Sequence, residues 1–236
     1  MKALIKKLID FLKARPYCLI LVIWPAQIIW YGVLNHLIVQ DPAKSHLIHI
    51  PLDDKIPYIR QFSLFYILWF AFIAACLIYV LIYSKKDFLR CAVGCMFTLY
   101  VCMTFCTIFP TYHDLRVADT GGGLTGLIVK MIYAADEPTV IYPSMHVMVS
   151  YVLAIRMTFA ESMKGKVWWK LFIWFFATMI TLSTMFIKQH SSADVFLALA
   201  LVIPFDLIVR FLILPDRRFK EKDAPAKAKE RDAVST

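Results

Sequence analysis

The chain has 236 residues, of which 60% are hydrophobic and only 18% charged, and its formal net charge is +9. Soluble domains are typically about 45–50% apolar and about 25% charged. The composition therefore excludes an ordinary soluble domain and indicates an integral membrane protein.

Residues 1–16 predict an amphipathic helix that lies on an anionic membrane surface. Its apolar side chains share one helical face, and most of its lysines lie opposite: Leu4, Ile5, Leu8, Ile9, Phe11 and Leu12 against Lys2, Lys6, Lys7 and Lys13. A cleaved signal peptide is the alternative, but charges interrupt the apolar stretch and no A-x-A cleavage site follows it.

Six later segments contain the roughly 20 mainly apolar residues that a helix needs to cross a bilayer. They are residues 17–39, 61–83, 88–110, 144–160, 168–187 and 193–214, each bounded by charges, Pro or Gly. We therefore predict an all-α fold, with a six-transmembrane-helix bundle over residues 17–214. Residues 215–236 are polar and alternate in charge, which predicts a solvated cytoplasmic tail.

The distribution of basic residues predicts the orientation, because cytoplasmic loops of membrane proteins carry an excess of Lys and Arg. With the N-terminus inside, most of the 26 Lys and Arg residues fall on the cytoplasmic side. Both termini are thus expected in the cytoplasm, in a multi-pass protein of the cell membrane. The net positive charge is explained by this orientation in the membrane. We therefore expect no nucleic acid partner.

Polar side chains that can carry chemistry gather on the outer side. His190 and Asp194 are four residues apart, so on a helix the carboxylate can reach the imidazole and orient it. Residues 191–194 also fit the S-x-x-D pattern of a helix start, and both roles can hold together. His146 enters the fourth span from the same side, after Pro143 and Ser144, which leave backbone N–H groups free to bind an anion.

Two histidines, one of them with an acidic partner, suit the chemistry of phosphate esters. One histidine attacks phosphorus and the other protonates the departing oxygen. Arg116 and Lys188 supply positive charge for the phosphate oxygens.

Two motifs in this region resemble those of the type-2 phosphatidic acid phosphatase superfamily. Pro143-Ser144-Met145-His146 is similar to its P-S-G-H motif. Ser183-Thr184, followed by His190 and then Asp194, matches the spacing of its S-R-x5-H-x3-D motif. The resemblance implies a six-helix membrane enzyme that acts on a lipid phosphate without a metal or other cofactor.

The resemblance also assigns roles to individual residues. It implies that His190 is the nucleophile and forms a phosphohistidine, that Asp194 orients it, and that His146 is the general acid. The substrate phosphate would be bound by Arg116, Lys188 and Ser144.

The chain departs from the superfamily pattern at three places. Met145 replaces the Gly of the second motif, and Thr184 replaces the Arg of the third. The first motif, K-x6-R-P, is absent in that form, because Phe109 stands where its Lys would be and Val117 follows Arg116. The remaining pattern is closer to the inositol phosphorylceramide synthase branch, whose members transfer a phospho-headgroup between lipids.

We therefore expect a membrane lipid phosphatase that hydrolyses a lipid phosphate or isoprenoid diphosphate at the outer leaflet. The alternative is a lipid headgroup phosphotransferase, similar to inositol phosphorylceramide or sphingomyelin synthases. A non-enzymatic lipid-binding or transport protein and a metal-dependent hydrolase are the other classes considered. His113 and Asp114 are weaker site candidates. The segment with Asp53 and Asp54 is assigned no role, because its carboxylates would repel phosphate.

Overall fold

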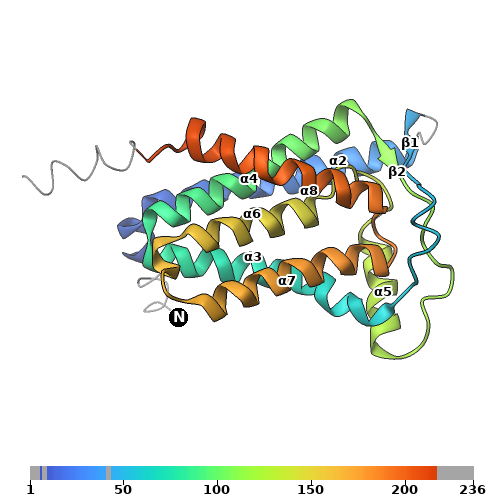
Figure 1. The fold of residues 1–236 in the computed structure, drawn as a ribbon. Coiled ribbons are helices and arrows are strands. Elements are labelled where there is room, and N and C mark those ends of the chain that lie inside the picture. Colours follow the sequence, from blue (N-terminus) through green and yellow to red (C-terminus); the bar gives the residue numbers. More distant parts are fainter. Residues whose placement is uncertain (1–5, 7–9, 41–43, 217–236) are drawn as a thin grey trace, which may run out of the picture.

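The computed structural model describes residue 6, residues 10–40 and residues 44–216, with the backbone alone for residues 38–40. Half of the surface helix predicted at 1–16 and most of the tail predicted at 215–236 lie outside the described residues. Within the described chain, long helices run side by side in one elongated bundle (Figure 1).

The described chain is mainly helical, as the composition predicted. The elements are η1 (Pro16–Ile23), α2 (Trp24–Gln40), β1 (His46–Leu47), η3 (Arg60–Phe62), α3 (Ser63–Tyr83), α4 (Lys85–Ile108), β2 (Thr111–Tyr112), α5 (Gly123–Ala135), α6 (Met145–Phe159), η4 (Glu161–Met163), α7 (Val167–Phe186), α8 (Ser192–Leu207) and η5 (Ile208–Ile213). Of these, η1, η3 and η4 are 3-10 helices and η5 is a π-helix.

Five stretches of the described chain are helical, long and apolar enough to cross a membrane, rather than the six expected. They are Pro16–Leu37, Arg60–Tyr83, Lys85–Ile108, Val167–Phe186 and Ser192–Ile213. The exception is the fourth predicted span, 144–160, where α6 has 15 residues. At about 1.5 Å per residue this helix is about 22 Å long, short of a hydrocarbon core of about 30 Å.

The short α6 is the central helix of the bundle. It packs against α4, α7, α8 and α3, and most of its residues are buried. Figure 1 shows it between α4 and α8 on one side and α3 and α7 on the other. A helix surrounded by other helices is apolar all round, like one surrounded by lipid, so hydropathy alone does not separate the two.

The helix α5 is a second difference, because it occupies a segment treated above as a loop. It begins after Gly122 and buries Gly126, Val129 and Ile132. A side chain at Gly126 would collide with the backbone oxygen of Gly121, so this position needs the close approach that only glycine allows.

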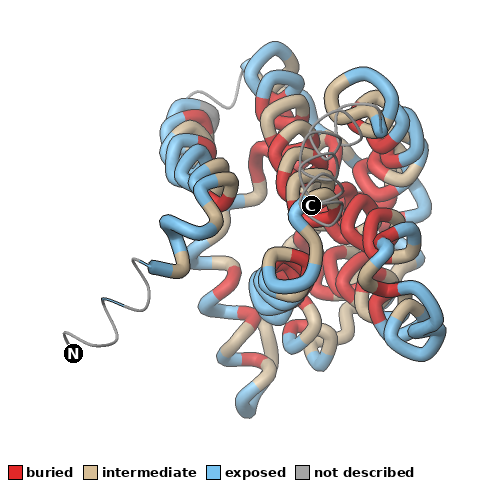
Figure 2. The backbone as a smooth tube through the Cα atoms, turned by 90° about the vertical axis from the view of Figure 1, so that its left-hand side faces the viewer, coloured by how far each residue is buried: buried red, intermediate tan, exposed pale blue. Residues whose placement is uncertain are grey.

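Buried residues lie on the inward sides of the helices, and the outward sides are exposed (Figure 2). The main core cluster joins α3, α4, α6 and α7 through buried side chains that include Val80, Phe88, Leu153 and Ile180. This rigid centre supports the short segments at the end of the bundle where α6 and α8 begin, which we call the site end.

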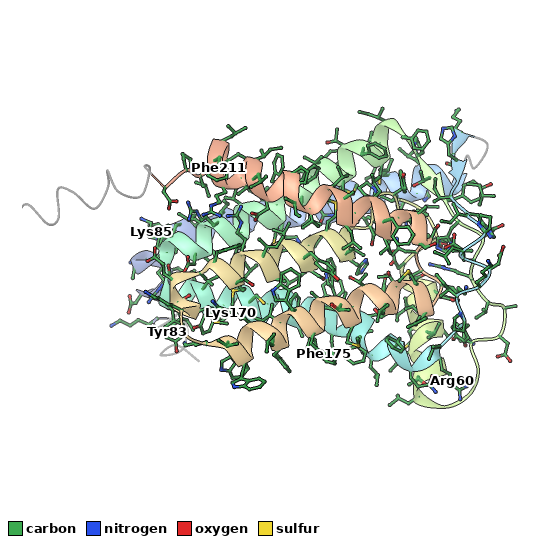
Figure 3. All side chains as sticks on the ribbon, in the orientation of Figure 1. Arg60, Tyr83, Lys85, Lys170, Phe175 and Phe211 are labelled. Atoms are coloured by element: carbon green, nitrogen blue, oxygen red, sulfur yellow. The ribbon has the colours of Figure 1, made fainter. Side chains whose placement is uncertain are left out.

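The site end is also where the loops pair with one another. β1 pairs with β2 in parallel, with His46 opposite Thr111, and Tyr112 bridges to Thr139. Arg60 lies at this end, whereas Lys85 and Lys170 lie at the opposite end of the bundle (Figure 3). The loops that precede α3, α6 and α8 are thus brought together although they are far apart in sequence.

Candidate active site

His190 and Asp194 form the hydrogen-bonded pair that their spacing predicted. His190 lies in the connection between α7 and α8, and its Nδ1 atom is 3.2 Å from Asp194 Oδ2. Both side chains are buried. An ionised Asp194 only accepts hydrogen bonds, so a neutral His190 that pairs with it carries the proton on Nδ1 and has a lone pair on Nε2. The arrangement presents one nitrogen of His190 as a nucleophile.

Asp194 also fixes the start of α8. Ser191 N donates to Asp194 Oδ2 at 2.9 Å, and the Ser191 hydroxyl accepts from Ala193 N at 3.1 Å. These contacts form a capping box, which satisfies N–H groups that the first turn leaves free. Both interpretations of the S-x-x-D pattern therefore hold, and the cap fixes the carboxylate that contacts His190.

His146 lies beside His190 although it comes from a different helix. Their ring centroids are 5.6 Å apart, with the planes at 66°. Two aromatic rings of α3 pack on His146: Trp69 at 4.2 Å and Tyr66 at 4.5 Å between centroids. These two rings restrict the orientation of the His146 imidazole. His146 and His190 therefore lie next to each other at the site end.

Ser144 is the N-cap residue of α6, two positions before His146. It is fully buried, and its hydroxyl makes no hydrogen bond within the described part of the chain. The first turn of a helix also leaves backbone N–H groups without intrahelical partners. Hydroxyl and N–H groups together form a donor set suited to a phosphate oxygen.

Arg116 reaches the same region, but its donors are bound to protein oxygens. Nε donates to Gln189 Oε1 at 2.9 Å, and Nη1 donates to Tyr133 O at 2.9 Å. Nη2 donates to the backbone oxygen of Asp136. The guanidinium contacts Gln189, the residue before His190, and so brings positive charge close to that histidine. Its other two hydrogen bonds connect the loop around residue 116 to α5 and to the segment that follows α5.

Lys188 precedes His190 by two residues and adopts a left-handed backbone conformation, with φ of 56°. Its Nζ atom donates to Asp53 O at 2.7 Å and Ile56 O at 2.6 Å. Burial lowers the pKa of Lys188, an effect that Asp53 and Asp54 oppose. The ammonium is thus anchored to two backbone oxygens of the loop before α3.

Asp53 is a functional candidate that the sequence analysis missed. Its Oδ1 accepts from Ser192 N at 2.7 Å and from the Ser192 hydroxyl at 2.6 Å. Its Oδ2 accepts from the Ser191 hydroxyl at 2.6 Å and from Ile50 N at 3.0 Å. Burial raises the pKa of Asp53, but these hydrogen bonds outweigh it and hold the pKa below its ordinary value. Three of the four donors come from Ser191 and Ser192, so the carboxylate fastens the segment that carries His190.

Asp136 is a second acidic residue that the sequence did not point to. It accepts hydrogen bonds from Tyr31 and, at 2.7 Å, from Tyr66, the residue whose ring packs on His146. Gln189 Nε2 lies 3.4 Å from Asp136 Oδ2. This network connects the residues around His146 with those around His190. No spacing pattern could have predicted it, since its members come from four separate segments.

His113 and His49 have different environments. His113 is buried, and burial, together with the nearby His190 and Arg116, lowers its pKa to about 3, so this ring is neutral near pH 7. His49 is exposed and lies between two carboxylates, 2.8 Å from Asp114 Oδ1 and 2.9 Å from Asp54 Oδ1. Hydrogen bonds to Asp114 and Asp54 raise the pKa of His49. It links the loop before α3 to the loop after α4.

No family model, curated protein or solved structure matches this chain. The functional argument consequently depends on the geometry of the site. His146, His190, Asp194 and Ser144 are grouped together at the starts of α6 and α8. Arg116 and Lys188 flank this group and are held by protein oxygens.

Proposed function

We propose that the protein is a membrane lipid phosphatase that hydrolyses a lipid phosphate or isoprenoid diphosphate through a phosphohistidine. The observation that carries the proposal is the buried His190–Asp194 pair with His146 beside it. The apolar helices around this site suit a substrate whose tail stays in a bilayer and whose phosphate reaches its edge. The motif resemblance described above supports the same assignment.

In the first step, His190 Nε2 attacks phosphorus and the bond to the leaving oxygen breaks. Burial and the nearby His190 lower the pKa of His146 to about 3, so the negative charge of a bound substrate phosphate is needed to favour its protonated form. His146 then donates its proton to that oxygen, while Asp194 stabilises the positive charge that develops on His190. In the second step, water attacks the phosphohistidine, gives its proton to His146, and inorganic phosphate leaves. Ser144 and the N–H groups of α6 bind the phosphate oxygens in both steps, with Arg116 and Lys188 contributing positive charge.

We also propose that the site end faces the outer side of the cell membrane, with six spans if α6 is counted. Lys85 and Lys170 at the opposite end support a cytoplasmic location for that end (Figure 3). The polar tail and the N-terminal surface helix would then lie on the cytoplasmic side as well.

A lipid headgroup phosphotransferase is the second candidate. It is supported by the burial of the nucleophile, because His190 is only 7% exposed and bulk water has little access to it. In this case the hydroxyl of a second lipid replaces water in the second step, and the phosphoryl-bearing headgroup moves to that lipid.

The proposal is tested by phosphate release from lipid phosphates and polyprenyl diphosphates, in EDTA, by the purified protein and by His190→Ala. We expect release that is lost in the variant, and a phosphoprotein that is labile in acid and stable in base, as a phosphohistidine is. Release only when a lipid alcohol is supplied would select the transferase. A folded wild-type protein that forms neither product nor phosphoprotein would refute both.

A further inference from the structure

An apolar groove opens on the side of the bundle between the N-terminal helices and α3. Its volume is about 340 Å³, and its lining is mainly apolar, with Leu21, Trp24 and Ile28 from the N-terminal helices and Trp69, Ile73 and Leu77 from α3. Ligand sites for apolar molecules are commonly of this size and character.

The groove exists because the first helical stretch packs loosely. Only 17% of the most apolar window of Pro16–Leu37 is buried, against 56% for that of Lys85–Ile108. Figure 2 shows this N-terminal stretch at the margin of the bundle, largely exposed. Further along, α2 closes against the site end, where Gln27 Nε2 lies 3.9 Å from Met145 Sδ.

One face of α3 connects the groove to the candidate active site. Tyr66, Trp69, Ile73, Leu77 and Leu81 follow one another at intervals of three or four residues, so they share one side of the helix. The first two pack on His146, and the last four line the groove, with Trp69 belonging to both. From Trp69 to Leu81 the helix rises about 18 Å, at about 1.5 Å per residue.

We propose that this groove binds the hydrocarbon chain of the substrate while its phosphate lies at His146 and His190. The identity of the headgroup rests on the proposed function, but the tail site rests on the groove itself. Trp69 is 8% exposed, packs on His146 with 4.2 Å between ring centroids, and also lines the groove, so one side chain contacts both. A phospholipid with its headgroup at the site thus has its chain directed along α3. Specificity for chain length would be set there and not at the polar site.

Two adjacent alanines provide a matched test. Ala74 lines the groove, whereas Ala75 is exposed on the same helix and is not part of the lining. The probe is a long-chain alkyl phosphonate with a diazirine on its chain, added to the full-length protein in lipid nanodiscs. We expect photolabelling on groove residues of wild type and of Ala75→Trp, and at least tenfold less labelling of the groove in Ala74→Trp. Ala74→Leu serves as a smaller replacement if the tryptophan prevents folding.

The labelling does not depend on turnover, so the two proposals can fail separately. Groove labelling without any product from lipid phosphates would refute the phosphatase and leave a lipid-binding groove. Labels spread evenly over the lipid-facing residues, or concentrated on Phe105 and Phe109 of the larger 450 Å³ cavity, would refute the groove. In an active enzyme, Ala74→Trp should raise KM for long-chain substrates about tenfold and leave that for a soluble aryl phosphate unchanged.

Discussion

Asp53 and Ser192 are joined by two hydrogen bonds across 139 residues of sequence, one from the backbone N–H and one from the hydroxyl of Ser192, both to the same carboxylate oxygen. The first turn of α8 thus obtains a cap from a distant loop in addition to its own capping box. Since His190 lies immediately before this turn, the loop before α3 helps to set its position.

Replacing Asp53 should therefore affect both stability and turnover. Asp53→Ala leaves four donors from residues 50, 191 and 192 without their acceptor, and we expect a loss of about 2–3 kcal/mol in unfolding free energy. Thermal unfolding in detergent measures the loss. Because the carboxylate pKa is held below its ordinary value, its contribution is present above about pH 4 and is lost as the pH falls through the depressed pKa.

Asp54 is the matched control for this experiment. It is adjacent, 68% exposed at its side chain, and bonded only to His49 among the described residues. Asp54→Ala should shift unfolding by less than about 0.5 kcal/mol. Equal effects of the two substitutions would contradict the role given to Asp53.

The role of His146 predicts a dependence on the leaving group. A general acid matters most when the departing oxygen is a poor leaving group, as in a lipid phosphate. We expect His146→Gln to slow hydrolysis of a lipid phosphate by about 10²–10⁴-fold and that of p-nitrophenyl phosphate far less. His190→Ala should abolish both reactions. If His146→Gln slowed the two substrates equally, His146 would serve binding and not proton transfer.

The two carboxylates around His49 predict a pH-dependent link between loops. Its pKa is raised, so the interaction with Asp54 and Asp114 is fully formed below the ordinary histidine pKa of about 6.5 and is lost as the pH rises through the raised value. Hydrogen exchange at residues 46–56 should accelerate across that range. His49→Gln should remove the pH dependence, and Asp114→Asn should move the midpoint to lower pH. A flat profile in wild type would contradict the link.

Arg156 and Asp206 form an ion pair inside the bundle, away from the site, with both side chains less than 10% exposed. Removing one partner leaves a buried charge, and we expect Arg156→Leu or Asp206→Leu to cost about 3–5 kcal/mol. The double replacement should be markedly less harmful than the sum of the two. Additive effects in this double-mutant cycle would show that the pair contributes no interaction energy.

Sequence periodicity and residue chemistry anticipated the parts of the molecule that depend on local rules. Hydropathy located five helices that are long and apolar enough to cross a membrane within a few residues, and a spacing of four predicted the contact of His190 with Asp194. The sixth predicted span is not confirmed: α6 is apolar but has only 15 residues, and burial among helices selects the same side chains as burial in lipid. Asp53 and Asp136 could not be found this way, since their partners are determined by the packing of loops remote in sequence.

The contacts of Asp53 have a consequence for biogenesis. The loop that contains it is synthesised early, whereas Ser191 and Ser192 arrive with the last pair of helices. In a nascent chain, the Asp53 carboxylate therefore cannot form its hydrogen bonds to Ser191 and Ser192 until α7 and α8 have been synthesised. The segment that carries His190 obtains its contacts with Asp53 only then, so a chain interrupted before α7 and α8 lacks the arrangement of His190 described above.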